Sequence, residues 1–90
     1  MKTPTIPKVR NFNEVKNQFI ITTKEGVYFQ SNKSLICFKP NEPGEKTILD
    51  KNYWDYSRTT GKYRNLFLNE TKKETEAKIK SGEHILADLN

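Results

Sequence analysis

Between residues 18 and 50 the chain alternates short apolar runs with short polar turns. Four runs rich in β-branched and aromatic residues, at 18–23, 27–30, 35–39 and 46–50, predict strands. The polar stretches between them are too short for a parallel crossover, so neighbouring strands are expected to pair antiparallel. Gly26, in the first of these turns, is the residue expected to supply a positive φ. The third run is nearly continuous in apolar residues, which predicts a central strand.

The second half of the chain predicts two helices. One covers about 60–68 and is capped by Ser57 or Thr59. The next follows Thr71, where the Thr71-Lys72-Lys73-Glu74 run matches a capping box, and ends before Gly82. A last apolar stretch, 84–89, predicts a short docking strand. The expected fold is therefore α+β: a small antiparallel sheet of three or four strands, then two helices and a short C-terminal segment. We expect residues 1–10 to be a flexible basic tail and residues 11–90 to be a single domain.

The rarer residue types exclude several kinds of site. A single cysteine, Cys37, cannot form an internal disulfide and lies in an apolar run, so a buried thiol is expected. With one histidine, His84, and one cysteine, a zinc site would need carboxylate ligands, which structural sites rarely use, and no Ser-His-Asp order is persuasive because no sharp nucleophile turn occurs. We therefore expect no metal, no cofactor and no enzymatic activity. The sequence has no signal peptide and no apolar stretch of about 20 residues, so we expect a cytoplasmic protein without a membrane partner.

The segment from Tyr53 to Arg64 contains the candidate binding residues. Its basic side chains have no acid between them, in a chain of net charge +5, and the first amides of a helix attract anions. Two other interpretations stay open: the hydroxyl residues could simply cap the helix, and Trp54 could be a core anchor instead of a stacking surface for bases. The predicted binding residues are Arg58, Lys62, Arg64, Tyr53, Tyr63, Thr59 and Thr60.

Two stretches, 26–38 and 53–65, resemble a family of small proteins of unknown function encoded by bacteriophages, prophages and other mobile elements. Its pattern, Trp-Ser-x-Thr-Thr-x-Lys-His, corresponds here to the run from Trp54 to Tyr63, with Asp55 and Tyr56 inserted and Tyr63 in place of the histidine. The resemblance implies no activity or site residue. It implies a phage accessory protein in the cytoplasm of an infected bacterial cell.

Three functions are compatible with these features. The first is a non-enzymatic accessory protein that contacts nucleic acid, or a nucleic-acid-bound machine, through the basic and aromatic surface. The second is a protein–protein inhibitor of a host defence effector, such as an anti-CRISPR protein acting on a ribonucleoprotein. The third is a structural or assembly component of the phage. An exposed edge strand such as 18–23 could also pair with its twin in a homodimer.

Overall fold

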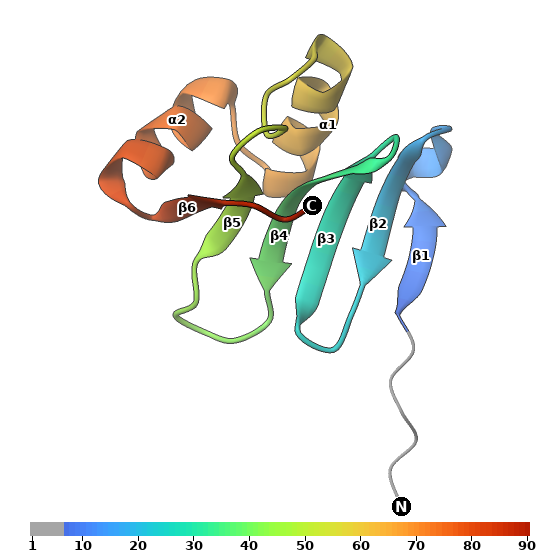
Figure 1. Cartoon of the computed structure of the whole chain (residues 1–90), viewed down its shortest axis with the longest axis horizontal. Coiled ribbons are helices and arrows are strands. Elements are labelled where there is room, and N and C mark those ends of the chain that lie inside the picture. The colour runs from blue at the N-terminus through green and yellow to red at the C-terminus, as the bar shows by residue number, and fades with distance from the viewer. Residues whose placement is uncertain (1–6) are drawn as a thin grey trace, which may run out of the picture.

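The computed structural model of the chain describes residues 7–90 and consists of one six-stranded sheet with helices packed on it (Figure 1). The strands follow one another in the sheet in chain order, and all neighbouring pairs are antiparallel except β5 and β6, which are parallel. The predicted α+β class is confirmed, with six strands in place of three or four. The elements are β1 (Lys8–Asn11), the 3-10 helix η1 (Phe12–Glu14), β2 (Gln18–Thr22), β3 (Gly26–Ser31), β4 (Ser34–Pro40), β5 (Thr47–Asp50), α1 (Arg58–Leu68), α2 (Lys72–Ser81) and β6 (His84–Ala87).

The two additional strands lie at the edges of the sheet. The first three residues of β1, 8–10, were expected in the flexible N-terminal tail, but they pair with β2; residues 1–6 of that predicted tail lie outside the described residues. Because β1 pairs with β2, the 18–22 segment is an interior strand and cannot be the edge proposed for a homodimer. β6 forms the opposite edge, and the predicted central position of β4 is confirmed.

The core lies between the sheet and α1. Phe29 of β3 and Phe67 of α1 have ring centroids 5.8 Å apart, and Phe12 of η1 packs edge-on against Phe29 at 5.7 Å. Cys37 lies opposite Phe29 in β4 and is fully buried, as predicted. Burial raises the pKa of the Cys37 thiol above its usual range, so the group stays protonated and unreactive.

Gly26 has a role other than the one predicted for it. It is the first residue of β3, and positive φ among the glycines occurs at Gly44 and Gly82. A Cβ at Gly26 would lie 2.3 Å from the carbonyl oxygen of Lys39 and 2.7 Å from the ring of Phe38. The glycine is therefore required by close packing between β3 and β4, since no side chain fits there.

Both helix starts match the sequence predictions. Ser57 is the N-cap of α1, and its hydroxyl accepts the Thr60 N–H at 3.1 Å. At α2 the capping box is complete: Thr71 Oγ1 accepts the Glu74 N–H, and the Glu74 carboxylate accepts the Thr71 N–H. Gly82 ends α2 in the left-handed conformation, with φ of 84°. These local signals define both ends of α2 without reference to any tertiary contact.

Asp50, the last residue of β5, fastens two segments to the sheet. Its buried carboxylate accepts the N–H groups of Asn52 at 3.0 Å, Tyr53 at 2.9 Å and Leu89 at 2.7 Å. Burial alone would raise the pKa of Asp50, but these three backbone donors outweigh it and hold the pKa below its usual range. One ionised side chain thus fixes both the turn that leads to α1 and the residues that follow β6.

Replacing Asp50 by asparagine should destabilise the fold by about 2–3 kcal/mol, because a donor would then face buried N–H groups. The stabilisation from Asp50 is fully present above the unfolded pKa, near 3.9, and is lost as the pH falls through the lower folded pKa. D50N should therefore lose less stability than the wild type between about pH 4 and pH 2.

Urea unfolding followed by Trp54 fluorescence across this pH range measures both effects. Asp88→Asn, at a nearby exposed position, is the matched control and should change stability by less than about 0.5 kcal/mol. Equal losses in the two variants would contradict the role assigned to Asp50.

Candidate functional site

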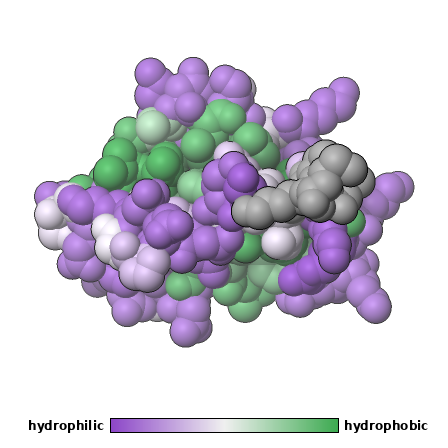
Figure 2. Space-filling view, turned by 90° about the horizontal axis from the view of Figure 1, so that it is seen from below, coloured by the Kyte–Doolittle hydropathy of each residue, from purple (hydrophilic) through white to green (hydrophobic). Residues whose placement is uncertain are grey.

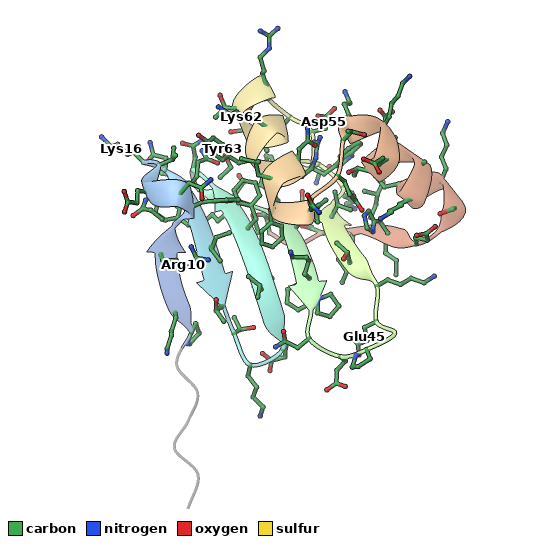
Figure 3. All side chains as sticks on the ribbon, turned by 180° about the vertical axis from the view of Figure 1, so that it is seen from behind. Arg10, Lys16, Glu45, Asp55, Lys62 and Tyr63 are labelled. Atoms are coloured by element: carbon green, nitrogen blue, oxygen red, sulfur yellow. The ribbon has the colours of Figure 1, made fainter. Side chains whose placement is uncertain are left out.

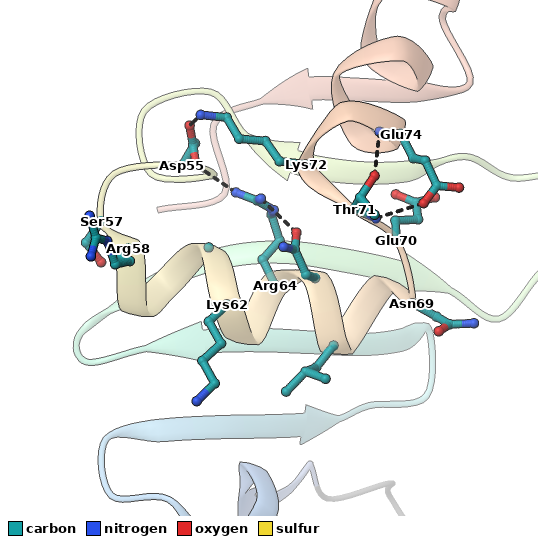
Figure 4. Close-up of a pocket in the computed structure, with 13 residues that line it drawn as sticks. Asp55, Ser57, Arg58, Lys62, Arg64, Asn69, Glu70, Thr71, Lys72 and Glu74 are labelled. Carbon is teal, nitrogen blue, oxygen red and sulfur yellow. Dashed lines mark hydrogen bonds and ion pairs between the residues drawn. The ribbon is translucent and has the colours of Figure 1, made fainter.

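An open groove of about 1030 Å³ runs between α1 and the start of α2, with the loop before α1 at one end (Figure 4). A second hollow, of about 220 Å³, lies at the β2–β3 and β4–β5 loops. Four basic and three acidic side chains line the groove, so its electrostatic character depends on which of them are paired within the fold. These residues are Asp55, Arg58, Lys62, Arg64, Glu70, Lys72 and Glu74.

Arg64 is a structural residue of this groove and not a surface cation. It is only 1% exposed, and its guanidinium donates to Asp55 Oδ1 at 3.0 Å, to the Trp54 carbonyl at 2.7 Å and to Asn65 Oδ1 at 2.9 Å. The guanidinium also lies 5.1 Å from the centroid of the Trp54 ring. Its Nε has no hydrogen-bond partner among the described residues. Arg64 thus clamps the loop before α1 onto the helix, which corrects the prediction that it forms part of a binding surface.

The loop of residues 51–57 is a series of turns, so its aromatic side chains do not point alternately to two faces as they would in a strand. Trp54 is partly buried against the core and acts as an anchor. Tyr53 and Tyr56 instead lie together, with ring centroids 5.7 Å apart in an edge-to-face pair, and are 36% and 49% exposed. The Tyr56 hydroxyl accepts a long hydrogen bond of 3.5 Å from Asn32 of the β3–β4 turn.

The Asp55 carboxylate is neutralised by two cations within the fold. Besides Arg64, it pairs with Lys72, the first residue of α2, whose Nζ is 2.7 Å from Oδ2 (Figure 4). Burial raises the pKa of Asp55, but the hydrogen bonds from Lys72 and Arg64 outweigh it and leave the pKa lowered. The same contact raises the pKa of the Lys72 ammonium. This pair connects the loop before α1 to α2 across the groove.

The two other carboxylates of the groove, Glu70 and Glu74, also have hydrogen-bond partners within the fold. Glu70 forms an ion pair with Lys78, lies 3.0 Å from His84 Nε2 and accepts the Thr75 hydroxyl at 2.9 Å. Burial opposes ionisation of Glu70, but the hydrogen bonds from Lys78, His84 and Thr75 leave its pKa lowered. Glu74 is part of the capping box of α2. Each carboxylate in the groove therefore has partners supplied by the fold itself.

Arg58 and Lys62 differ from the other charged residues of the groove. Both are exposed on α1, and among the residues described neither forms an ion pair with a carboxylate. Lys62 lies with its Nζ 5.5 Å from the centroid of the Tyr63 ring, which packs in turn against Phe12 at 5.6 Å. Figure 3 shows Lys62 and Tyr63 on the helix side of the sheet, at the same end as Lys16. The groove is thus left with an unbalanced positive rim on α1.

The structure separates the seven predicted binding residues into two groups. Arg58, Thr59, Lys62 and Tyr53 are exposed and Tyr63 is half-buried, so these remain available for contact. Thr60 is fully buried, and its hydroxyl donates to Ser31 of β3 at 3.0 Å, so it fastens α1 to the sheet. Thr60 and Arg64 are therefore not part of the candidate binding surface.

Sequence reasoning missed the residues that shape the groove. Asp55, Glu70 and Lys72 are ordinary charged residues in the chain, and no local signal links Asp55 to Lys72, which lies seventeen positions further along. No cluster of three or more His, Cys, Asp or Glu side chains suited to a metal ion occurs in the part of the chain that the structure describes. None of the helices within residues 7–90 has both the length and the apolar character needed to span a membrane.

Comparison with known proteins identifies a family without an assigned role. The sequence profile described as "Family of unknown function (DUF8033)" matches residues 1–83. No curated protein and no solved structure matches the chain.

Replacing Arg64 by methionine should destabilise the fold by about 3 kcal/mol, because a buried ion pair is broken and the Trp54 carbonyl loses its donor. Arg64→Lys keeps the charge, but a single ammonium cannot make all three hydrogen bonds of the planar guanidinium, so it should lower the free energy of unfolding by about 1–3 kcal/mol. The matched control is Arg58→Met on the exposed face of the same helix, which should change stability by less than about 0.5 kcal/mol. Urea titrations give all three values, and similar losses for Arg64→Met and Arg58→Met would contradict the clamp.

Proposed function

The chain belongs to the DUF8033 family of unknown function, and we propose that it is a non-enzymatic binding protein that contacts nucleic acid, or a nucleic-acid-bound machine, through the groove beside α1. The observation that carries this proposal is the charge balance of the groove. Asp55 and Glu70 form ion pairs with cations within the fold, and Glu74 accepts only the Thr71 N–H, whereas Arg58 and Lys62 have no carboxylate partner among the described residues, so two unmatched cations face one unmatched acid. Phosphate groups are the ligands that such a pair of unmatched cations favours.

The start of α1 adds to this preference. Arg58 is the first residue of the helix, so its side chain extends from the end at which the backbone N–H groups carry partial positive charge. The exposed Tyr53–Tyr56 pair belongs to the loop that leads into this helix end. Aromatic rings next to cations are the combination that binds single strands, with the cations on phosphates and the rings on bases.

The protein's overall charge is consistent with the same ligand class. The net charge of +5 favours approach to a polyanion and disfavours mimicry of a nucleic acid by an acidic surface. Occupation of the groove would need no movement of Arg64 or Asp55, because their contacts with each other are internal to the fold. The groove is therefore preorganised, which limits the entropy lost on binding.

The proposal predicts a salt-dependent affinity for a fluorescein-labelled single-stranded oligonucleotide, measured by anisotropy between about 50 and 300 mM NaCl. Arg58→Ala with Lys62→Ala should weaken binding and reduce the log–log salt slope by about 1.4, since each phosphate contact on a single strand contributes about 0.7. The Tyr53→Ala and Tyr56→Ala changes should weaken binding with little effect on the slope.

The matched control removes two exposed lysines from the loops at the other end of the sheet, Lys24→Ala with Lys46→Ala. It lowers the net charge by the same amount and should leave most of the affinity intact. Equal losses in the two double variants would show that only net charge matters. Undetectable binding by the wild type at 50 mM NaCl would overturn the nucleic-acid proposal, and nuclease-resistant capture of one host protein would then favour the inhibitor hypothesis.

A further inference from the structure

A row of six apolar side chains crosses the sheet on the face opposite α1. The register of the strands aligns them one after another: Val9 with Ile21, Ile21 with Tyr28, Tyr28 with Phe38, Phe38 with Ile48, and Ile48 with Ile85. Aligned residues point to the same face, and neighbours along a strand point to opposite faces. Since Phe29 and Leu49 pack into the core beneath α1, the row belongs to the other side.

No described helix covers this face. Within the row Phe38 is buried, at 9% exposed, and Ile21, Tyr28 and Ile48 are half-buried. The ends of the row, Val9 and Ile85, are 61% and 44% exposed. Near the middle, the rings of Tyr28 and Phe38 pack at a tilt of 38° with centroids 4.5 Å apart. Figure 2, viewed from the end where the β2–β3 and β4–β5 loops lie, shows hydrophobic surface gathered between hydrophilic borders. Partly exposed apolar side chains aligned in this way make the face a candidate interaction site.

The strand residues on this face carry no exposed charge, although charged residues of the β2–β3 and β4–β5 loops border it beside Phe38. The exposed charged residues of the strands, Lys8, Arg10 and Lys39, align with Thr22, Ile20 and Val27 on the helix side. Asp50, which alternation places on the open side, is buried and bound by backbone N–H groups. Without cations, this face does not suit nucleic acid.

We propose that the open sheet face binds a second copy of the chain, so that two sheets pack face to face through the six-residue row. In a chain of net charge +5, most pairs of surfaces would bring like charges together, and this face avoids that repulsion. Pairing through the outer edge of β1 would not avoid this repulsion, because it would place Lys8 and Arg10 opposite the same residues of the second copy. A two-fold axis near the central Tyr28–Phe38 pair lays the row onto its own copy.

The size of the row sets the strength of this dimer. Five inter-strand spacings of about 4.8 Å give a length of roughly 24 Å, and a width of two side-chain positions gives a footprint of about 350 Å². That is roughly half of the ~800 Å² that each partner contributes to a standard interface. The dimer should therefore be weak, forming at high micromolar concentration and dissociating on dilution.

Sedimentation velocity from about 10 µM to 1 mM tests this inference on the full chain. The wild type should shift from monomer towards dimer, and Val9→Lys with Ile85→Lys should stay monomeric across the range. Leu66→Lys with Ala77→Lys is the matched control, because both residues are exposed on the helices and the variant adds the same two charges, and it should dimerise like the wild type. A wild type that remains monomeric at 1 mM, or a V9K/I85K variant that dimerises normally, would overturn the proposal.

Two further measurements separate this surface from the groove. Amide chemical-shift changes on diluting the wild type should fall on the strand residues of the open face, and changes confined to α1 and α2 would overturn the proposal without any substitution. Added salt should strengthen the dimer by screening the like net charges, whereas it should weaken nucleic-acid binding. The dimer and the oligonucleotide complex therefore succeed or fail independently.

Discussion

The buried guanidinium of Arg64 is the interaction on which the candidate site depends. A charge that is 1% exposed must be matched inside the protein, and here Asp55, the Trp54 carbonyl and Asn65 match it. The loop between β5 and α1 is consequently held against the helix, and Lys72 adds α2 to the same carboxylate. The groove exists because these three segments are fixed relative to one another by a single ion-pair network.

The same network explains why the helix side is positively charged at its surface. Carboxylates within the groove are used to fasten segments, as in the contacts of Glu70 with Lys78 and His84. Basic side chains outnumber acidic ones in the chain, so cations such as Arg58 and Lys62 are left at the rim. The opposite face of the sheet differs: its one charged strand residue, Asp50, is buried and bound by backbone N–H groups, and the row from Val9 to Ile85 carries no charge. The molecule therefore presents two surfaces of contrasting chemistry.

Much of the fold could be predicted where the signal was local. The caps at Ser57 and Thr71 and the stop at Gly82 depend on hydrogen bonds within one turn, and their residue types alone identify them. The strand runs between residues 18 and 50 were found for the same reason, since alternation and turn composition are local properties. β1 was missed because its four residues are all exposed and it is held mainly by pairing with β2. The parallel docking of β6 on β5 depends on contacts across more than thirty residues.

Residue type and short-range spacing are enough to predict the α+β class, the caps of both helices, the burial of Cys37 and the presence of cations near the start of α1. The role of each cation depends instead on contacts between distant segments. Arg58, Lys62 and Arg64 look equivalent along the chain, but helical geometry directs Arg64 towards Asp55 and Trp54 and leaves the other two in solvent. The tertiary structure also decides that Val9, Ile21, Tyr28, Phe38, Ile48 and Ile85 form one row, because strand register is set by pairing between segments and is not encoded in any one of them.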